Sequence, residues 1–203
     1  MRFLGLICTF AASITIGNCL LCTECYNKTT PNCDGSIATC ASCLTMITEE
    51  GHGNDYVSMI EKSCSLYPEV CNISYSVTAD NFHLGFVSSC CDTDLCNRDN
   101  ITAPPKNTTE NGVVCPSCVL QNGTECVNIQ TMRCVGNENR CISFSGKLFD
   151  QGSCKNYTLQ GCVTENVCKA KDIPLYPKTQ LCEFQNLECS EGSSDPSNQD
   201  YEK

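Results

Sequence analysis

The sequence predicts an all-β, disulfide-rich protein with two tandem small domains, and three observations support this fold class. Cysteine accounts for 22 of the 203 residues, a frequency typical of secreted chains in which disulfides replace a large apolar core. The cysteines of residues 20–97 and 115–189 form two groups of ten around a cysteine-free segment. Within the groups, apolar and polar residues alternate as they do in half-buried strands.

Residues 1–19 are predicted to be a secretory signal peptide. Arg2 precedes an apolar run, Phe3–Ile16, and small residues follow where a signal peptidase cleaves. The run is shorter than a membrane span requires, so we expect cleavage before Leu20 and an extracellular protein. Cleavage removes Cys8 and Cys19, and the 20 remaining cysteines can all form pairs.

The net charge excludes one class of partner. The chain carries a formal charge of -10, and loss of Arg2 with the signal peptide makes it -11. Nucleic acid is therefore not expected as a partner, because phosphate binding requires clustered Lys and Arg. The acidity either steers a basic protein partner toward the molecule or serves solubility alone.

The first domain, residues 20–97, is predicted to consist of hairpins. Strands near residues 44–48 and 56–61 flank a polar tip that has no apolar side chain to bury. That tip, residues 49–55, either contacts a partner or is a plain surface loop. A further hairpin has alternating apolar residues on both sides of the turn pair Asp80-Asn81: Ile73, Tyr75 and Val77 before it, Leu84 and Phe86 after it.

The rest of the chain is predicted to hold a linker, a second domain and a tail. Residues 98–112 contain two prolines, two glycosylation sequons and no cysteine, so they are interpreted as a linker at which the domains hinge. Residues 113–189 form the second domain and repeat the early cysteine spacing of the first, which indicates duplication. The polar, acidic tail, residues 190–203, lacks the hydrophobic segment of a glycolipid anchor, so we expect no membrane anchor.

Two motifs resemble the three-finger (snake-toxin-like) domain of the Ly-6/uPAR family. They are the opening Leu21-Cys22-x2-Cys25 and the ending Cys90-Cys91-x4-Cys96-Asn97. Adjacent cysteines cannot easily bond to each other, so Cys90 and Cys91 need different partners. The resemblance implies a three-finger fold in both domains and eight disulfides, and it leaves Cys154, Cys168, Cys182 and Cys189 unassigned. The implied disulfides are Cys22-Cys43, Cys25-Cys33, Cys40-Cys64, Cys71-Cys90, Cys91-Cys96, Cys115-Cys141, Cys118-Cys126 and Cys134-Cys162.

The two-domain layout also resembles two groups of secreted proteins. It is similar to the gamma-type phospholipase A2 inhibitors of snake plasma in the opening Asn111-Gly112-x2-Cys115-Pro116 and in Gly161-Cys162 and Cys189. It is similar to the sodefrin-precursor-like courtship pheromones of amphibians in the Cys19-Leu20-Leu21-Cys22 junction and in the Asn54-Asp55 finger leading to Cys64. The first resemblance implies a binding protein that blocks the lipid-facing surface of a secreted phospholipase A2. The second implies a signal read by a chemosensory receptor.

Enzymatic and metal-dependent functions find no support in the sequence. Three Cys-x2-Cys pairs, at 22/25, 40/43 and 115/118, have zinc-ligand spacing, but in an oxidising compartment disulfides consume the thiolates. Two histidines, His52 in the polar tip and His83 on a predicted strand, have no neighbouring motif that would orient them for catalysis. We therefore expect no catalytic residue, no metal and no cofactor. The sequence does not indicate an oligomeric state.

Six sequons predict N-glycosylation of the secreted chain, because none has proline in its middle position. The acceptor residues are Asn27, Asn72, Asn100, Asn107, Asn122 and Asn156.

Overall fold

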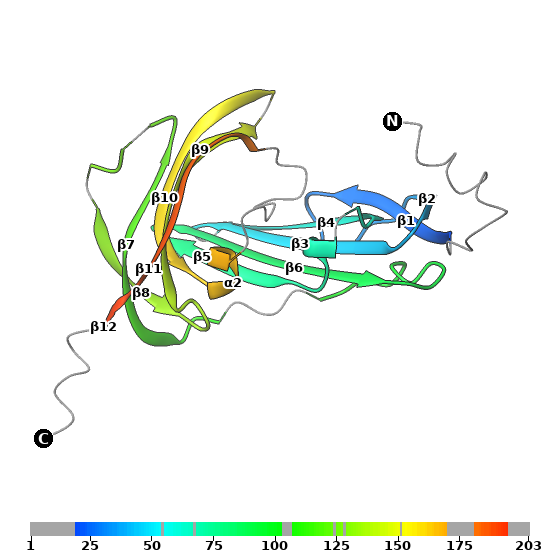
Figure 1. Cartoon of the computed structure of the whole chain (residues 1–203), viewed down its shortest axis with the longest axis horizontal. Coiled ribbons are helices and arrows are strands. Elements are labelled where there is room, and N and C mark those ends of the chain that lie inside the picture. The colour runs from blue at the N-terminus through cyan, green and yellow to red at the C-terminus, as the bar shows by residue number, and fades with distance from the viewer. Residues whose placement is uncertain are drawn as a thin grey trace, which may run out of the picture. The chain divides into compact units, whose positions relative to one another are not determined.

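The computed structural model describes residues 19–194 except 54, 67, 103–106, 124, 128, 151 and 170–180. The predicted signal peptide before residue 19, part of the predicted linker and the end of the tail therefore lie outside the described residues. The described chain is built mainly of antiparallel strands, as the sequence predicts (Figure 1).

The secondary structure consists of twelve strands and two short helices within the described residues. The helices are η1 (Pro68–Val70) and α2 (Glu165–Lys169). The strands are β1 (Leu20–Asn27), β2 (Ser36–Cys40), β3 (Cys43–His52), β4 (Asp55–Cys64), β5 (Ser74–Ala79), β6 (Phe82–Cys91), β7 (Glu110–Gln121), β8 (Gln130–Val135), β9 (Arg140–Asp150), β10 (Ser153–Val163), β11 (Leu181–Glu191) and β12 (Ser193–Ser194).

The chain forms two compact units, and their residue ranges differ from those that a single division at the predicted linker would give. Unit 1 holds the described parts of Met1–Ile47, Val57–Ile73 and Val87–Ala103. Unit 2 holds Thr48–Tyr56, Ser74–Phe86 and the described part of Pro104–Lys203. The far ends of the β3–β4 and β5–β6 hairpins, which are the second and third fingers, thus belong to unit 2. The domain boundaries predicted above stay a prediction.

Unit 1 has a core in which sulfur replaces much of the usual apolar interior. In its sheet, β1 pairs antiparallel with β2 and with β4. Buried Leu20 packs there with the buried cysteines Cys22, Cys40 and Cys43. A smaller cluster joins Cys33 to Ile47 and Ile60, both of which are completely buried. Because the disulfides are themselves core groups, the unit needs few large apolar side chains.

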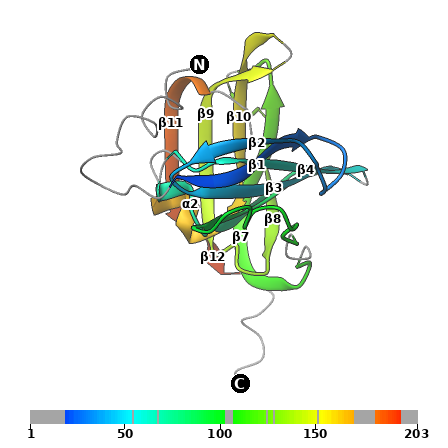
Figure 2. The same cartoon turned by 90° about the vertical axis from the view of Figure 1, so that its right-hand side faces the viewer.

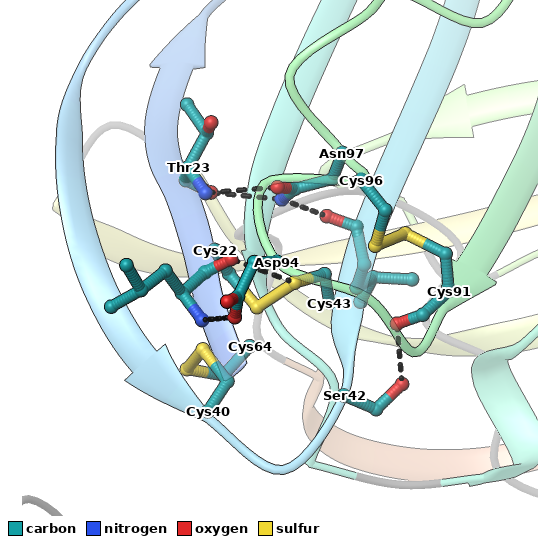
Figure 3. Close-up of a disulfide and its surroundings, with 12 residues drawn as sticks. Cys22, Thr23, Cys40, Ser42, Cys43, Cys64, Cys91, Asp94, Cys96 and Asn97 are labelled. Atoms are coloured by element: carbon teal, nitrogen blue, oxygen red, sulfur yellow. Dashed lines mark hydrogen bonds between the residues drawn. A yellow bond between two sulfur atoms is a disulfide. The ribbon is translucent and has the colours of Figure 1, made fainter. Parts of the chain in front are cut away.

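The loop closed by Cys91–Cys96 binds along β1 (Figure 3). The side chain of Asn97, which is 2% exposed, accepts a hydrogen bond from the Thr23 amide at 2.8 Å and donates to the Thr23 carbonyl at 2.9 Å. It also donates to the Leu44 carbonyl at 3.3 Å. Asn97 therefore satisfies buried backbone groups as a neighbouring strand would.

A buried lysine holds the segment that follows this loop. Lys62 on β4 is 1% exposed and donates to the Arg98 carbonyl at 2.7 Å and to Asn100 Oδ1 at 2.9 Å. Burial lowers the pKa of Lys62, and the nearby carboxylates Asp34 and Asp99 oppose this shift. Two well-placed acceptors thus partly compensate the loss of water around the ammonium group.

This lowered pKa predicts a pH dependence of stability. Between the folded-state pKa of Lys62 and its ordinary value of 10.5, the unfolded chain binds more protons than the folded chain. The contribution of Lys62 to the free energy of unfolding therefore rises with pH through that window. We expect urea unfolding at increasing pH, up to the ordinary pKa of 10.5, to show this rise in the wild type and not in Lys62→Met. An equal pH response of the two proteins would contradict the assignment.

Unit 2 is organised around strand β10. β9 pairs with one edge of β10 along its whole length, and β11 pairs with the other edge of β9. Figure 2 shows β11, β9 and β10 side by side. Strand β7 pairs with β10 and with β8, and β12 adds to β7. Four buried cysteines, Cys115, Cys134, Cys141 and Cys162, form the core next to β7 and β8.

Strand β5, which the sequence places in the first predicted domain, is paired with β10 inside unit 2. The register aligns Cys162 with Thr78 and Val163 with Val77. Gly161 allows this approach, because a Cβ atom there would lie 2.2 Å from the Thr78 carbonyl oxygen. This pairing was not predicted, since strand alternation does not reveal which distant strand is the partner.

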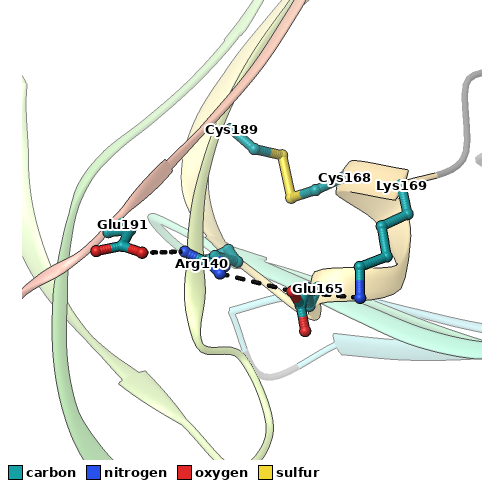
Figure 4. Close-up of polar contacts among 6 residues, drawn as sticks. All are labelled: Arg140, Glu165, Cys168, Lys169, Cys189 and Glu191. Atoms are coloured by element: carbon teal, nitrogen blue, oxygen red, sulfur yellow. Dashed lines mark hydrogen bonds and ion pairs between the residues drawn. A yellow bond between two sulfur atoms is a disulfide. The ribbon is translucent and has the colours of Figure 1, made fainter.

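The last part of the described chain is cross-linked to the rest of unit 2 (Figure 4). One disulfide joins Cys154 to Cys182, and another joins Cys168 on α2 to Cys189 on β11. The four cysteines left unassigned above therefore all have partners. Arg140 pairs with Glu191 at 2.9 Å and with Glu165 at 3.5 Å. Since β11 runs to Glu191 and β12 follows it, the first residues of the predicted tail are in strands.

In the part of the chain that the structure describes, no helix combines the length and the apolar character that crossing a bilayer requires.

Candidate functional site

The tip of the second finger and the turn of the third form the candidate binding surface in unit 2. The Gly53 amide donates to the Asn81 carbonyl at 2.8 Å, and the His52 and Phe82 rings lie 5.3 Å apart between centroids. Asn81 has a φ of 51°, which places it in the left-handed region that a tight turn requires. These contacts hold the two hairpin ends together.

We call this surface the acidic tip and define it by four carboxylates and one aromatic residue: Glu49, Glu50, Asp55, Asp80 and Tyr56. Neither residues 48–56 nor residues 74–86 contain a lysine or arginine. Tyr56 is 50% exposed, and its ring lies over Gly51, where a Cβ atom would come within 2.7 Å of it. The surface thus combines negative charge with an exposed, supported aromatic ring.

The carboxylates of the acidic tip differ in their surroundings. Glu50 Oε1 lies 2.7 Å from His52 Nε2, and the His52 side chain is largely exposed. Glu49 is half-buried, and burial raises the pKa of its carboxyl group. Asp55 and Asp80 are exposed. The exposed carboxylates can attract a basic face of another protein at long range, an effect that salt weakens.

His83 belongs to a hydrogen-bonded chain that was not predicted from the sequence. Its Nδ1 lies 3.0 Å from Thr78 Oγ1, and the Thr78 hydroxyl donates to Glu138 Oε1 at 2.8 Å. His83 is 7% exposed and Glu138 1% exposed. The sequence separation between Thr78 and Glu138 is 60 residues, so no local motif could reveal the contact.

The direction of these hydrogen bonds argues against nucleophilic catalysis by Thr78. Because the single hydroxyl proton of Thr78 is donated to Glu138, Nδ1 of His83 must carry a proton and donate to Oγ1. A general base would have to accept the hydroxyl proton instead. We interpret these hydrogen bonds between His83, Thr78 and Glu138 as a buried polar network that holds β5, β6 and the turn before β9 in place.

The cysteines that have zinc-ligand spacing are all in disulfides. The structure contains each of the eight disulfides that the Ly-6/uPAR resemblance implies, in addition to the two described above. The eight are Cys22-Cys43, Cys25-Cys33, Cys40-Cys64, Cys71-Cys90, Cys91-Cys96, Cys115-Cys141, Cys118-Cys126 and Cys134-Cys162. Sulfur atoms gather at Cys43, Cys91 and Cys96, and at Cys115, Cys134 and Cys162. Disulfide sulfurs are not thiolates, so these groups do not offer the ligands that zinc requires.

The six sequon asparagines occupy different local environments. Asn27 Oδ1 accepts from the Thr29 amide, Asn72 Oδ1 from the Cys90 amide and Asn107 Oδ1 from the Thr109 amide. The Asn100 side chain is held by Lys62, as described above. Asn122 follows β7 and is exposed, whereas Asn156 is half-buried within β10. Glycosylation at each site stays a prediction.

Comparison with known proteins identifies inhibitors among the relatives. No family model matches the chain. Phospholipase A2 inhibitor NAI of Notechis ater is 30% identical over 181 residues, which cover 83% of this chain and 86% of the relative. A phospholipase A2 inhibitor gamma subunit of Gloydius brevicaudus siniticus is 31% identical over 172 residues, which cover 79% and 82%. Ly6/PLAUR domain-containing protein 8 of Bos taurus is 27% identical over 199 residues, which cover 93% and 82%.

Proposed function

The chain belongs to the Ly-6/uPAR family of two-domain proteins that includes the gamma-type phospholipase A2 inhibitors, and from this premise we propose that it is a secreted binding protein that inhibits a secreted phospholipase A2. The observation that carries the proposal is the similarity to proteins named phospholipase A2 inhibitors over more than four-fifths of their length. The disulfide-closed fingers support it, because they present a rigid surface that loses little entropy on binding.

The acidic tip is the part of the molecule that we propose contacts the enzyme. Exposed tyrosines are frequent anchors of protein interfaces, and Tyr56 is positioned by its contact with Gly51. The exposed carboxylates around Tyr56 would accelerate association with a basic face of the enzyme. Covering the lipid-facing surface of the enzyme in this way would block access to aggregated substrate.

An inhibition assay with the purified glycoprotein tests the proposal. We expect hydrolysis of micellar phospholipid to fall to its minimum at a stoichiometric amount of protein, and hydrolysis of a soluble monomeric substrate to fall less. Tyr56→Ala is expected to weaken inhibition about tenfold or more, as loss of an aromatic anchor does. Ile129→Ala is the matched control, because Ile129 is 51% exposed and lies outside the acidic tip.

Two outcomes would separate the parts of the proposal. If Tyr56→Ala and Ile129→Ala weaken inhibition equally, the acidic tip is not the contact surface, but the inhibitor function itself is not refuted. Absence of inhibition of secreted phospholipases A2 at excess protein would refute the inhibitor function itself. The pheromone function would then be tested next, by asking whether expression is confined to a courtship gland.

A further inference from the structure

Two of the six sequon asparagines lie next to each other in unit 2, because Asn156 lies on β10 and Asn122 directly follows the paired strand β7. The β7–β10 register aligns Gln121 with Tyr157, and one residue further the Asn122 amide donates to the Asn156 carbonyl at 2.8 Å. The Gln121 amide group also donates to the Tyr157 hydroxyl, so the two strands are joined through side chains at this point. Asn122 has a φ of 64°, which places it in the left-handed region at the point where β7 has just ended.

We propose that Asn122 and Asn156 are mutually exclusive glycosylation sites, so that a correctly folded secreted molecule carries an N-glycan at one of them and not at both. An N-glycan is bulky compared with the separation of neighbouring strands. Two glycans attached on either side of one backbone hydrogen bond compete for the same space. Strands β7 and β10 can pair when one of the two asparagines carries a glycan, whereas a glycan on both opposes the pairing.

The surroundings of both residues limit how far they can move apart. Asn122 lies inside the loop closed by the Cys118–Cys126 disulfide, whose cysteines are only eight residues apart in sequence. Asn156 lies within β10, which is paired with β9 along its whole length. Asn156 therefore cannot shift without breaking the β9–β10 ladder, and the short disulfide-closed loop limits how far Asn122 can move. Chains that receive both glycans before folding are expected to be retained in the cell.

The other sequons provide the contrast. Asn27, Asn72 and Asn100 are in unit 1. Asn107 lies in unit 2 before β7, where its side chain accepts from the Thr109 amide and lies 3.0 Å from the position that a Cβ atom on Gly136 would take. None of these four has a backbone hydrogen bond to another sequon asparagine among the contacts of the described residues. Their occupancies should be independent of one another.

The test is a measurement of site occupancy in the secreted full-length protein. Enzymatic release of the glycans in heavy-oxygen water marks each glycosylated asparagine, and peptide mass spectrometry gives the occupied fraction at every site. We expect the fractions at Asn122 and Asn156 to add up to no more than one. A sum above one would require molecules with both glycans and would overturn the proposal.

Variants distinguish exclusion from a site that is simply not used. Thr124→Ala removes the first sequon without changing Asn122, and we expect it to raise the occupied fraction at Asn156; Asn156→Gln is expected to raise the fraction at Asn122. Asn107→Gln is the control and should change neither fraction. If neither Thr124→Ala nor Asn156→Gln raises the occupancy of the remaining site, the two sites are not coupled and the proposal is wrong.

Discussion

Replacement of both Cys134 and Cys162 by alanine is expected to lower the free energy of unfolding by about 4 kcal/mol. The bridge closes a loop with a sequence separation of 28 residues, for which the chain-entropy relation alone predicts about 3.5 kcal/mol. Both cysteines are completely buried, and Cys134 Sγ lies 3.4 Å from Cys115 Sγ. Loss of the two sulfur atoms therefore also removes packing from the core of unit 2.

The control for this prediction is the bridge Cys118–Cys126 in the same unit. Its sequence separation is 8 residues and both cysteines are only partly buried, so its removal is expected to cost about 2.5 kcal/mol. Urea unfolding of the two double alanine variants and the wild type measures the difference. Equal losses would mean that loop length and burial do not determine how much each bridge stabilises the fold.

Asn97→Ala is expected to lower the free energy of unfolding by about 3 kcal/mol, because it removes three buried hydrogen bonds. The Thr23 amide, the Thr23 carbonyl and the Leu44 carbonyl would each lose a partner in a region closed to water. Asn97→Asp keeps the acceptor for the Thr23 amide and loses both donated bonds. We therefore expect Asn97→Asp to be destabilising as well, since it also places a carboxylate in a buried position.

The matched control is Asp92→Ala, in the loop closed by Cys91–Cys96 that directly precedes Asn97. The Asp92 side chain is exposed, so its removal should change stability by less than about 0.5 kcal/mol. Unfolding by urea, with the protein kept oxidised, provides the comparison. If Asn97→Ala unfolds at the same urea concentration as the wild type, the hydrogen bonds of the Asn97 side chain do not stabilise the fold, and the prediction is wrong.

The prediction from sequence was accurate where structure follows from neighbouring residues. The hairpin with the turn pair Asp80-Asn81 is present as β5 and β6, and its alternation buries Tyr75, Val77 and Phe86. The second finger is also present, with β3 and β4 longer than the predicted strands. Alternation with a period of two is a local property, so it can be read from the residues themselves.

The candidate site was predictable only in part. The polar composition of residues 49–55 indicated a tip suited to contact, and several of its residues are exposed. The support of Tyr56 by Gly51, and the joining of the tip to Asn81, depend on how the second and third fingers lie beside each other. The network of His83, Thr78 and Glu138 likewise requires residues from distant parts of the chain.

By itself the sequence determined an all-β, disulfide-rich chain of the Ly-6/uPAR type, because cysteine content, alternation and the Cys90 to Asn97 ending depend on composition and short spacing. Only the tertiary structure decided that Cys154 pairs with Cys182 and Cys168 with Cys189, and that β5 pairs with β10. Cysteine order allows many pairings, and a strand edge accepts many partners. The choice among them is made by packing between residues far apart in the chain, which no local pattern encodes.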